Sequence, residues 1–402
     1  MKKILLLLGL LTTYSIVEAQ LLKKLKDKVD KTVDKTVDDA TKGKKDKEGS
    51  GGTSENTGGS NSAEPATMKT YSKYDFVPGE IIIVYEDFMQ DAVGDFPDKW
   101  NTNASGEIVT IEDQPGHWLK INKQGVFMPD FIDSLPDNFT FEYDLICDNP
   151  GAIWALYVSV ASVSDRGHPE SWNTASSRFT MTVAPQADGN CGSTVERRKD
   201  GTGEAATSTE SKQFTAKKIV HISMWRQKER MRVYFNQEKA WDLPKAMSPN
   251  DKYNAIVWWL QGPGQNASYY MGNLRLGVGA PDTRKKILEQ KKWVTHGILF
   301  DVNSATIKPE SYGTLKEMAD VMKEYTDLKV KIVGHTDADG SDAANLDLSK
   351  KRAASVKESL AKEFGIDESR METDGKGESE PIDKNDTPAG KANNRRVEFI
   401  KL

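Results

Sequence analysis

The chain has 402 residues, of which 37% are apolar and 29% are charged, and its formal net charge at pH 7 is −5. This length predicts two or three domains rather than one, and the composition excludes a mostly membrane-embedded protein. The negative charge argues against nucleic acid or an anionic membrane surface as the main partner.

The first residues predict export from the cytoplasm. Lys2 and Lys3 precede an apolar stretch from Ile4 to Leu11, and Val17 and Ala19 provide a cleavage site before Gln20, which is the pattern of a secretory signal peptide. The apolar stretch is shorter than the roughly 20 residues of a membrane-spanning helix. We expect cleavage after residue 19, no transmembrane segment afterwards and, without a nearby cysteine, no lipid anchor.

Two segments of low complexity follow. Apolar residues recur every four positions in 20–42 between Lys and Asp, which predicts an amphipathic charged helix. This helix could be solvated, form a coiled coil, or contact a partner or the outer membrane. Residues 43–70 are rich in Gly, Ser, Asn and Thr and predict a flexible linker.

Residues 71–280 carry short runs of β-branched and aromatic residues between turn residues, which predicts an antiparallel β-sandwich. The segment "VHISMWRQKERMRVYFNQEKAWDL" predicts a three-stranded meander with turns near 227–230 and 236–238. This segment resembles hairpins of concanavalin A-like and laminin G-like jelly rolls, and "YEDFMQDAVGDFPDKW" is similar to their opening strand. The resemblance implies a jelly-roll-like fold and leaves the ligand open.

The sandwich holds several candidate site residues. Trp225, Trp258 and Trp259 are candidate stacking platforms for a glycan, with core packing as the alternative. Cys147 and Cys191 could form one disulfide or remain two inert thiols.

Catalysis is a weaker interpretation of the same region. Glu142 and Asp144 lie on one face of a strand, as the two carboxylates of a glycosidase would, but Ile146 and Cys147 stand where a third acid belongs. The sequence offers no Ser/His/Asp set, phosphate loop or cluster with metal-ligand spacing. We therefore expect no enzyme activity, cofactor or metal, and keep a glycan hydrolase or lectin of the envelope as the alternative.

A connector at 281–294 leads to residues 295–402, whose pattern changes to β-α-β-α-β-(α)-β. This order predicts a two-layer α/β domain with both main helices on one sheet face. Gly365 is expected to end the second helix.

An acidic turn and a basic helix in this domain suggest a binding site. A strand that ends at Asp337 brings a carboxylate to the rim of the sheet, and Asn345, Ser349 and Arg352 share one face of the next helix. Asp337 could accept the ammonium of an amino-acid zwitterion while Arg352 holds its carboxylate bidentately. Alternatively, the two residues form only a surface salt bridge worth about 0–1 kcal/mol.

Four motifs in order, "FDVNSATIKPES", "VGHTDADGSDAANLDLSKKRAASV", "DGKGESEP" and "NNRRVEF", resemble the OmpA-like peptidoglycan-binding domain. The resemblance implies that Asp337 and Arg352 hold the diaminopimelate of the stem peptide, that Asn345 matches the motif's asparagine, and that Asp301 and Asn303 form another wall of the pocket.

The same resemblance implies that residues 394–396 brace the closing strand and that His335 shapes the turn. It also implies a non-catalytic protein in the periplasm of a Gram-negative bacterium that tethers the outer membrane, or an envelope assembly, to the cell wall.

Overall fold

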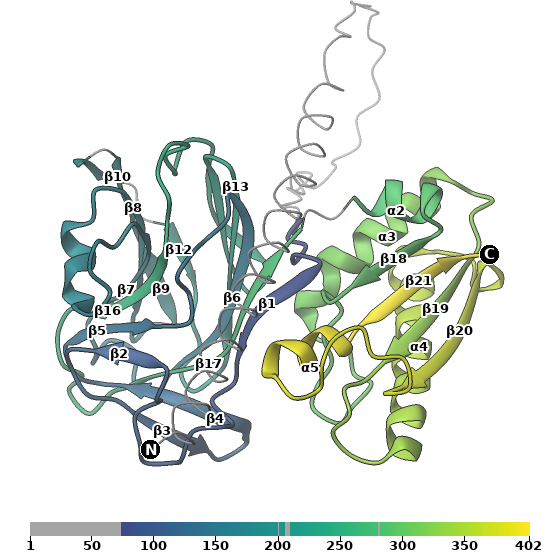
Figure 1. Cartoon of the computed structure of the whole chain (residues 1–402), viewed down its shortest axis with the longest axis horizontal. Coiled ribbons are helices and arrows are strands. Elements are labelled where there is room, and N and C mark those ends of the chain that lie inside the picture. The colour runs from purple at the N-terminus through teal and green to yellow at the C-terminus, as the bar shows by residue number, and fades with distance from the viewer. Residues whose placement is uncertain (1–73, 200, 206–209, 280–281) are drawn as a thin grey trace, which may run out of the picture. The chain divides into compact units, whose positions relative to one another are not determined.

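The computed structural model describes residues 74–402 apart from 200, 206–209 and 280–281. The predicted signal peptide, the helix at 20–42 and the linker at 43–70 lie outside the described residues. Tyr74–Leu402 form one compact unit that contains a β-sandwich followed by an α/β domain (Figure 1).

The first sheet of the sandwich has eight strands in the order β15-β14-β13-β6-β17-β4-β3, with β1 also paired to β17. Its strands are β1 (Ile81–Glu86), β3 (Glu107–Ile111), β4 (Gln114–Ile121), β6 (Asn138–Cys147), β13 (Val220–Gln227), β14 (Arg230–Phe235), β15 (Glu238–Leu243) and β17 (Tyr269–Val278). The predicted meander is confirmed as β13, β14 and β15, and Lys228 and Asn236 take the positive φ angles of 54° and 51° that its tight turns need.

The second sheet has the order β11-β10-β8-β7-β16-β5-β2, and β9 joins β12 to β8. Its elements are β2 (Trp100–Thr102), β5 (Gly125–Pro129), β7 (Leu156–Ala161), the short helix η1 (Pro169–Thr174), β8 (Arg178–Pro185), β9 (Asn190–Ser193), β10 (Val195–Lys199), β11 (Thr202–Ala205), β12 (Glu210–Gln213) and β16 (Ala255–Leu260).

Aromatic side chains fill the space between the two sheets. The rings of Phe141 and Tyr143 on β6 lie 5.8 Å and 5.6 Å from the ring of Trp258 on β16. Because side chains alternate along a strand, Glu142 and Asp144 point to the opposite, outer face of the first sheet. The antiparallel sandwich is thus confirmed, and its assignment as a jelly roll stays a prediction.

The C-terminal domain is built on a sheet in the order β18-β21-β19-β20, in which only β19 and β20 are parallel. Its elements are α2 (Thr283–Glu289), β18 (Lys292–Thr295), η2 (Pro309–Ser311), α3 (Tyr312–Glu324), β19 (Val330–His335), α4 (Asp342–Phe364), η3 (Glu368–Arg370), β20 (Met371–Gly377), α5 (Pro388–Asn394) and β21 (Val397–Lys401). The core joins Met318 of α3 and Leu360 of α4 to Ile332 and Phe399 of the sheet, so both main helices cover one face, as predicted.

The start of this domain differs from the sequence prediction. The expected connector at 281–294 forms α2 and most of β18, because Trp293 is 1% exposed and stacks on Phe399 at 5.3 Å. Phe300 and Ile307 are joined by a single isolated bridge. Gly365 does end α4, with a φ of 70°.

Two glycines let α4 approach the sheet closely enough to place its side chains beside the end of β19. A Cβ at Gly334 would lie 2.3 Å from the carbonyl oxygen of Ser349, and one at Gly375 would lie 2.4 Å from the backbone nitrogen of Lys350. Neither contact is possible for a real Cβ, so a larger residue at either position must push α4 away.

We expect Gly375→Ala to lower the free energy of unfolding by about 1–3 kcal/mol, the usual cost of overpacking. Urea denaturation followed by circular dichroism measures it. Gly167→Ala is the control, because its Cβ would meet only a side-chain oxygen of Asp165 at 3.3 Å. Equal stability of Gly375→Ala and the wild-type protein would contradict this packing.

Candidate functional site

The turn after β19 is held in shape by Asn345 of α4. Its Nδ2 donates to the carbonyl oxygens of Asp337 and Asp339 at 3.3 Å and 3.1 Å, and to Oε2 of Glu378 at 2.5 Å. Asn345 is 6% exposed, so it lies behind the turn. The geometry gives Asn345 a part in positioning Asp337.

Asp337 presents a carboxylate at the rim of the sheet, as the sequence predicts. Its Oδ2 accepts a hydrogen bond from Nη1 of Arg395 at 2.5 Å, and its Oδ1 accepts one from the N–H of Asp339 at 3.3 Å. No ion pair joins Asp337 to Arg352 in the part of the chain that the structure describes. The surface salt bridge considered above is therefore made by Asp337 with a different arginine.

Arg352 is half-buried beside this carboxylate with its guanidinium partly free. Its Nε donates to the carbonyl oxygen of Ser304 at 2.9 Å, and its guanidinium carbon lies 4.9 Å from the ring centroid of Phe300. Burial and the nearby Arg395 lower the pKa of Arg352, and Asp337 opposes this shift. Its two terminal nitrogens have no hydrogen bond to any described residue, and they are available to a carboxylate.

The loop at 301–304 forms one side of this site through its backbone. Ser304 supplies the carbonyl oxygen that holds Arg352, while Asp301 and Asn303 are exposed and Asn303 has a φ of 52°. The carboxylate of Asp301 and the carboxamide of Asn303 have no hydrogen-bond partner among the described residues, so both can turn toward a ligand.

Arg395 is the site residue that sequence reasoning missed. Its neighbours do brace the chain: Oδ1 of Asn394 accepts the N–H groups of Ile382 and Asp383, and Nε of Arg396 donates to Glu398 at 2.9 Å. Arg395 instead reaches Asp337. Adjacent side chains along an extended segment point to opposite sides. This alternation could have indicated that Arg395 faces away from the side taken by Asn394 and Arg396.

His335 is buried beside the closing strand β21. It is 2% exposed, and its Nε2 lies 3.6 Å from Oε2 of Glu398 on β21. Burial acts to raise the pKa of Glu398, but the nearby His335, Lys292 and Arg396 outweigh burial and lower it to about 2. This buried charge cluster sits under the turn, in agreement with a structural role for His335.

The three tryptophan candidates in the sandwich have different environments. Trp258 is 0% exposed, so its proposal as a glycan platform is wrong. Trp225 is partly exposed, but the guanidinium of Arg232 covers its ring at 4.9 Å. Trp259 is partly exposed on the outer face of the second sheet, 4.7 Å from the ring of Tyr157.

Glu142 and Asp144 share a face as predicted, but they belong to a buried ionic cluster. Nδ1 of His221 lies 2.7 Å from Asp144 and its Nε2 lies 3.2 Å from Glu142. Arg275 donates to both oxygens of Glu142 at 2.8 Å. Burial acts to raise the pKa of both carboxyls, but Arg275 and His221 outweigh it at Glu142, and His221 with Lys308 and Asn273 outweighs it at Asp144, so both pKa values are lowered. A glycosidase acid needs a raised pKa.

Cys147 and Cys191 are free thiols in the structure, so the disulfide considered above is absent from it. Both side chains are buried, and burial raises the pKa of each thiol to about 12. A thiolate is the reactive form, and the structure therefore supports the alternative of two inert thiols.

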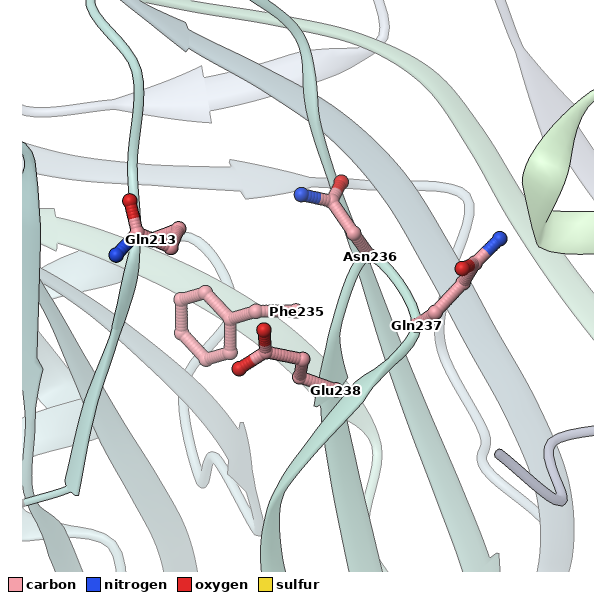
Figure 2. A pocket seen from close by; sticks show the side chains of 5 residues that line it. All are labelled: Gln213, Phe235, Asn236, Gln237 and Glu238. Atoms are coloured by element: carbon pink, nitrogen blue, oxygen red, sulfur yellow. The ribbon is translucent and has the colours of Figure 1, made fainter. Parts of the chain in front are cut away.

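A pocket lies at the turn between β14 and β15 (Figure 2). Its lining consists of Gln213, Phe235, Asn236, Gln237 and Glu238. The single acid in this lining, Glu238, lies 3.7 Å from the ammonium of Lys212. The pocket lacks the two facing acids that would support a glycan hydrolase.

Comparison with known proteins assigns the C-terminal part of the chain. The model of the OmpA family matches residues 299–395. Residues 299–395 are an OmpA family domain. Asp337, Arg352 and Arg395 all lie inside the matched segment.

Two curated relatives share this domain. Outer membrane porin F of Pseudomonas fluorescens is 46% identical over 101 residues, which cover 25% of this chain and 31% of the relative. The peptidoglycan-binding protein ArfA of Mycobacterium bovis is 40% identical over 108 residues, covering 27% of this chain and 33% of the relative. The chain thus spans about a third of the length of these relatives.

Among solved structures, the peptidoglycan-associated lipoprotein of Burkholderia pseudomallei is 28% identical with a TM-score of 0.25, covering 26% of this chain and 88% of that one. No helix within the described ranges is both long enough and apolar enough to cross a bilayer.

Proposed function

We propose that the OmpA family domain binds the diaminopimelate-containing stem peptide of peptidoglycan and that the protein tethers the outer membrane, or an envelope assembly, to the cell wall. The observation that carries this proposal is the free guanidinium edge of Arg352 beside the Asp337 carboxylate. Diaminopimelate has an end with both an ammonium and a carboxylate, and Asp337 and Arg352 match the two charges. The periplasm of a Gram-negative bacterium is the location that fits this role.

The proposed contacts explain how a site of a few side chains could hold a large polymer. Each charge-assisted hydrogen bond contributes about 1.5–3 kcal/mol, so a single site binds modestly. The sacculus repeats the same ligand many times, and this repetition raises the overall strength of attachment. Asn345 then acts by fixing the turn, and Asp301 and Asn303 are proposed to border the ligand.

Co-sedimentation with diaminopimelate-containing sacculi tests the proposal. We expect wild-type protein to pellet and Asp337→Ala and Arg352→Ala each to lose at least tenfold in affinity, because each leaves one ligand charge unpaired. Lys351→Ala is the matched control, since Lys351 lies on the same helix in an exposed pair with Asp347. Equal pelleting of all four folded proteins would contradict the proposal.

For the sandwich we propose a non-catalytic role. It is supported by the pairing of the Asp144 and Glu142 carboxylates with the buried cations His221 and Arg275. A glycan-binding role, the alternative considered from the sequence, would rest on Trp259, which stays partly exposed beside Tyr157. Binding of the full chain to a glycan array, compared with that of Trp259→Ala, tests this alternative. Binding that is lost in Trp259→Ala would support a lectin, and no binding by either protein would support a sandwich that only separates the neighbouring segments.

A further inference from the structure

One strand of the sandwich is joined to the C-terminal domain next to the proposed site. The N–H of Ile82 on β1 donates to Oδ1 of Asn393 on α5 at 2.9 Å, and Nδ2 of Asn393 donates to the carbonyl oxygen of Ile82 at 2.9 Å. Asn393 is 5% exposed, and Nε2 of His296 lies 2.8 Å from its carbonyl oxygen. The carboxamide of Asn393 therefore pairs with β1 as a neighbouring strand would.

This junction brings a sandwich side chain to the site. Tyr85 lies three residues after Ile82 on β1, and Arg395 lies two residues after Asn393. The guanidinium carbon of Arg395 is 5.0 Å from the ring centroid of Tyr85, within the range of a cation–π contact. The same guanidinium donates to Asp337 at 2.5 Å. Tyr85, Arg395 and Asp337 thus form one chain of contacts from the sandwich to the proposed ligand site.

Arg395 is a permanent cation in this arrangement. Burial acts to lower its pKa, but Tyr85, Asp337 and Asp87 outweigh burial and raise it. Arg395 is also close enough to Arg352 to lower the pKa of that group. Arg395 contacts Asp337 directly, and the charge of Asp337 also acts on Arg352, so the two guanidinium groups and the one carboxylate together carry a charge of +1. This balance suits a ligand whose carboxylate is shared between the two arginines.

We propose that the sandwich completes the ligand site, with Tyr85 as the positioning residue that holds Arg395 beside Asp337 so that Arg352 and Arg395 together bind the ligand carboxylate. This inference rests on the proposed function and adds that the OmpA family domain binds at full strength only when β1 is docked on α5. Tyr85 acts through Arg395 and does not itself touch the ligand.

Calorimetric titration of the full mature chain with a soluble disaccharide tripeptide containing diaminopimelate tests this inference. We expect Tyr85→Leu to raise the Kd about tenfold, equivalent to ~1.4 kcal/mol, because the guanidinium loses its aromatic support. Tyr85→Phe keeps the ring and should stay within about twofold. Tyr325→Leu is the matched control, because it removes a similar cation–π contact elsewhere in the C-terminal domain. The ring centroid of Tyr325 lies 5.3 Å from the guanidinium carbon of Arg284.

A second probe, in which the diaminopimelate carboxylate is amidated, tests whether Tyr85 acts by positioning Arg395 or only by stabilising the folded protein. In the wild-type protein amidation should weaken binding at least tenfold, since it removes the charge that the two arginines share. In Tyr85→Leu this penalty should shrink, because only Arg352 remains in place. A merely structural role of Tyr85 would leave the penalty unchanged and would overturn the inference.

The two proposals fail in different ways. Loss of binding in Arg352→Ala together with wild-type affinity in Tyr85→Leu overturns only the role of the sandwich. Full binding in Arg352→Ala overturns the proposed function. If Tyr85→Leu does not fold, Arg395→Lys replaces it: a lysine keeps the charge without the planar group, and we expect the same tenfold weakening. Wild-type affinity in Arg395→Lys would also overturn the inference.

Discussion

Replacing His221 with glutamine is expected to lower the free energy of unfolding by about 3–5 kcal/mol, the cost of removing one partner from a buried ion pair. His221 is 6% exposed and contacts Asp144 at 2.7 Å and Glu142 at 3.2 Å. Although burial disfavours its charge, the two carboxylates raise the pKa of His221 to about 10, so it is an imidazolium at neutral pH. Glutamine has a similar size but no charge, and it leaves Asp144 without its main cation.

Urea denaturation at pH 7 measures this effect. His168→Gln is the control, because His168 is an exposed histidine whose contact with Glu170 is also exposed, with side-chain exposures of 71% and 54%. We expect the control to change stability by less than about 0.5 kcal/mol. A loss below about 1 kcal/mol in His221→Gln would show that the cluster does not depend on the imidazolium.

The cluster around His221 also lies where the C-terminal domain docks. Nη1 of Arg275 donates to the carbonyl oxygen of His296 at 3.0 Å, while its other nitrogens hold Glu142. Lys308 of the C-terminal domain contributes to the lowered pKa of Asp144. The face of the sandwich that carries Glu142 and Asp144 is therefore also contacted by the C-terminal domain.

Much of the fold follows from periodicity in the sequence. The meander of β13 to β15 has clear alternation and turn residues, and α3 and α4 have apolar residues at helical spacing with Gly365 as a stop. The start of the C-terminal sheet was missed, because β18 has only four residues and its placement depends on the stacking of Trp293 on Phe399. That contact joins residues far apart in the sequence, and no local pattern reveals it.

The site divides in the same way. Asp337 and Arg352 could be chosen from a strand end and a helix face, which are local features. Arg395 pairs with Asp337 across 58 positions, and Tyr85 comes from another domain. Likewise, the alternation of side chains along a strand predicts that Glu142 and Asp144 share a face. The positions of the cations His221 and Arg275 beside them depend instead on how neighbouring strands pair. Register between distant strands is fixed by packing and turns rather than by local sequence.

The free energy of unfolding of the wild-type protein is expected to fall as the pH rises from about 6.5 to about 10. His221 has an ordinary pKa of 6.5 and a pKa of about 10 in the folded protein. Below 6.5 both states bind the proton and the stabilisation is complete; above 6.5 the unfolded chain loses its proton while the folded protein keeps it. The slope for one such group approaches about 1.4 kcal/mol per pH unit.

Urea denaturation at half-unit steps from pH 6 to pH 10 measures this slope, and His221→Gln isolates the contribution of the imidazole. Cys147 and Cys191 also weaken the fold toward high pH, because the pKa of each is raised from 9 to about 12, but they act equally in both proteins. The difference in stability between wild type and variant should therefore narrow steadily as the pH rises through this window. A difference that stays constant would mean that His221 is neutral in the folded protein, and the buried carboxylates would then owe their charge to Arg275 and Lys308.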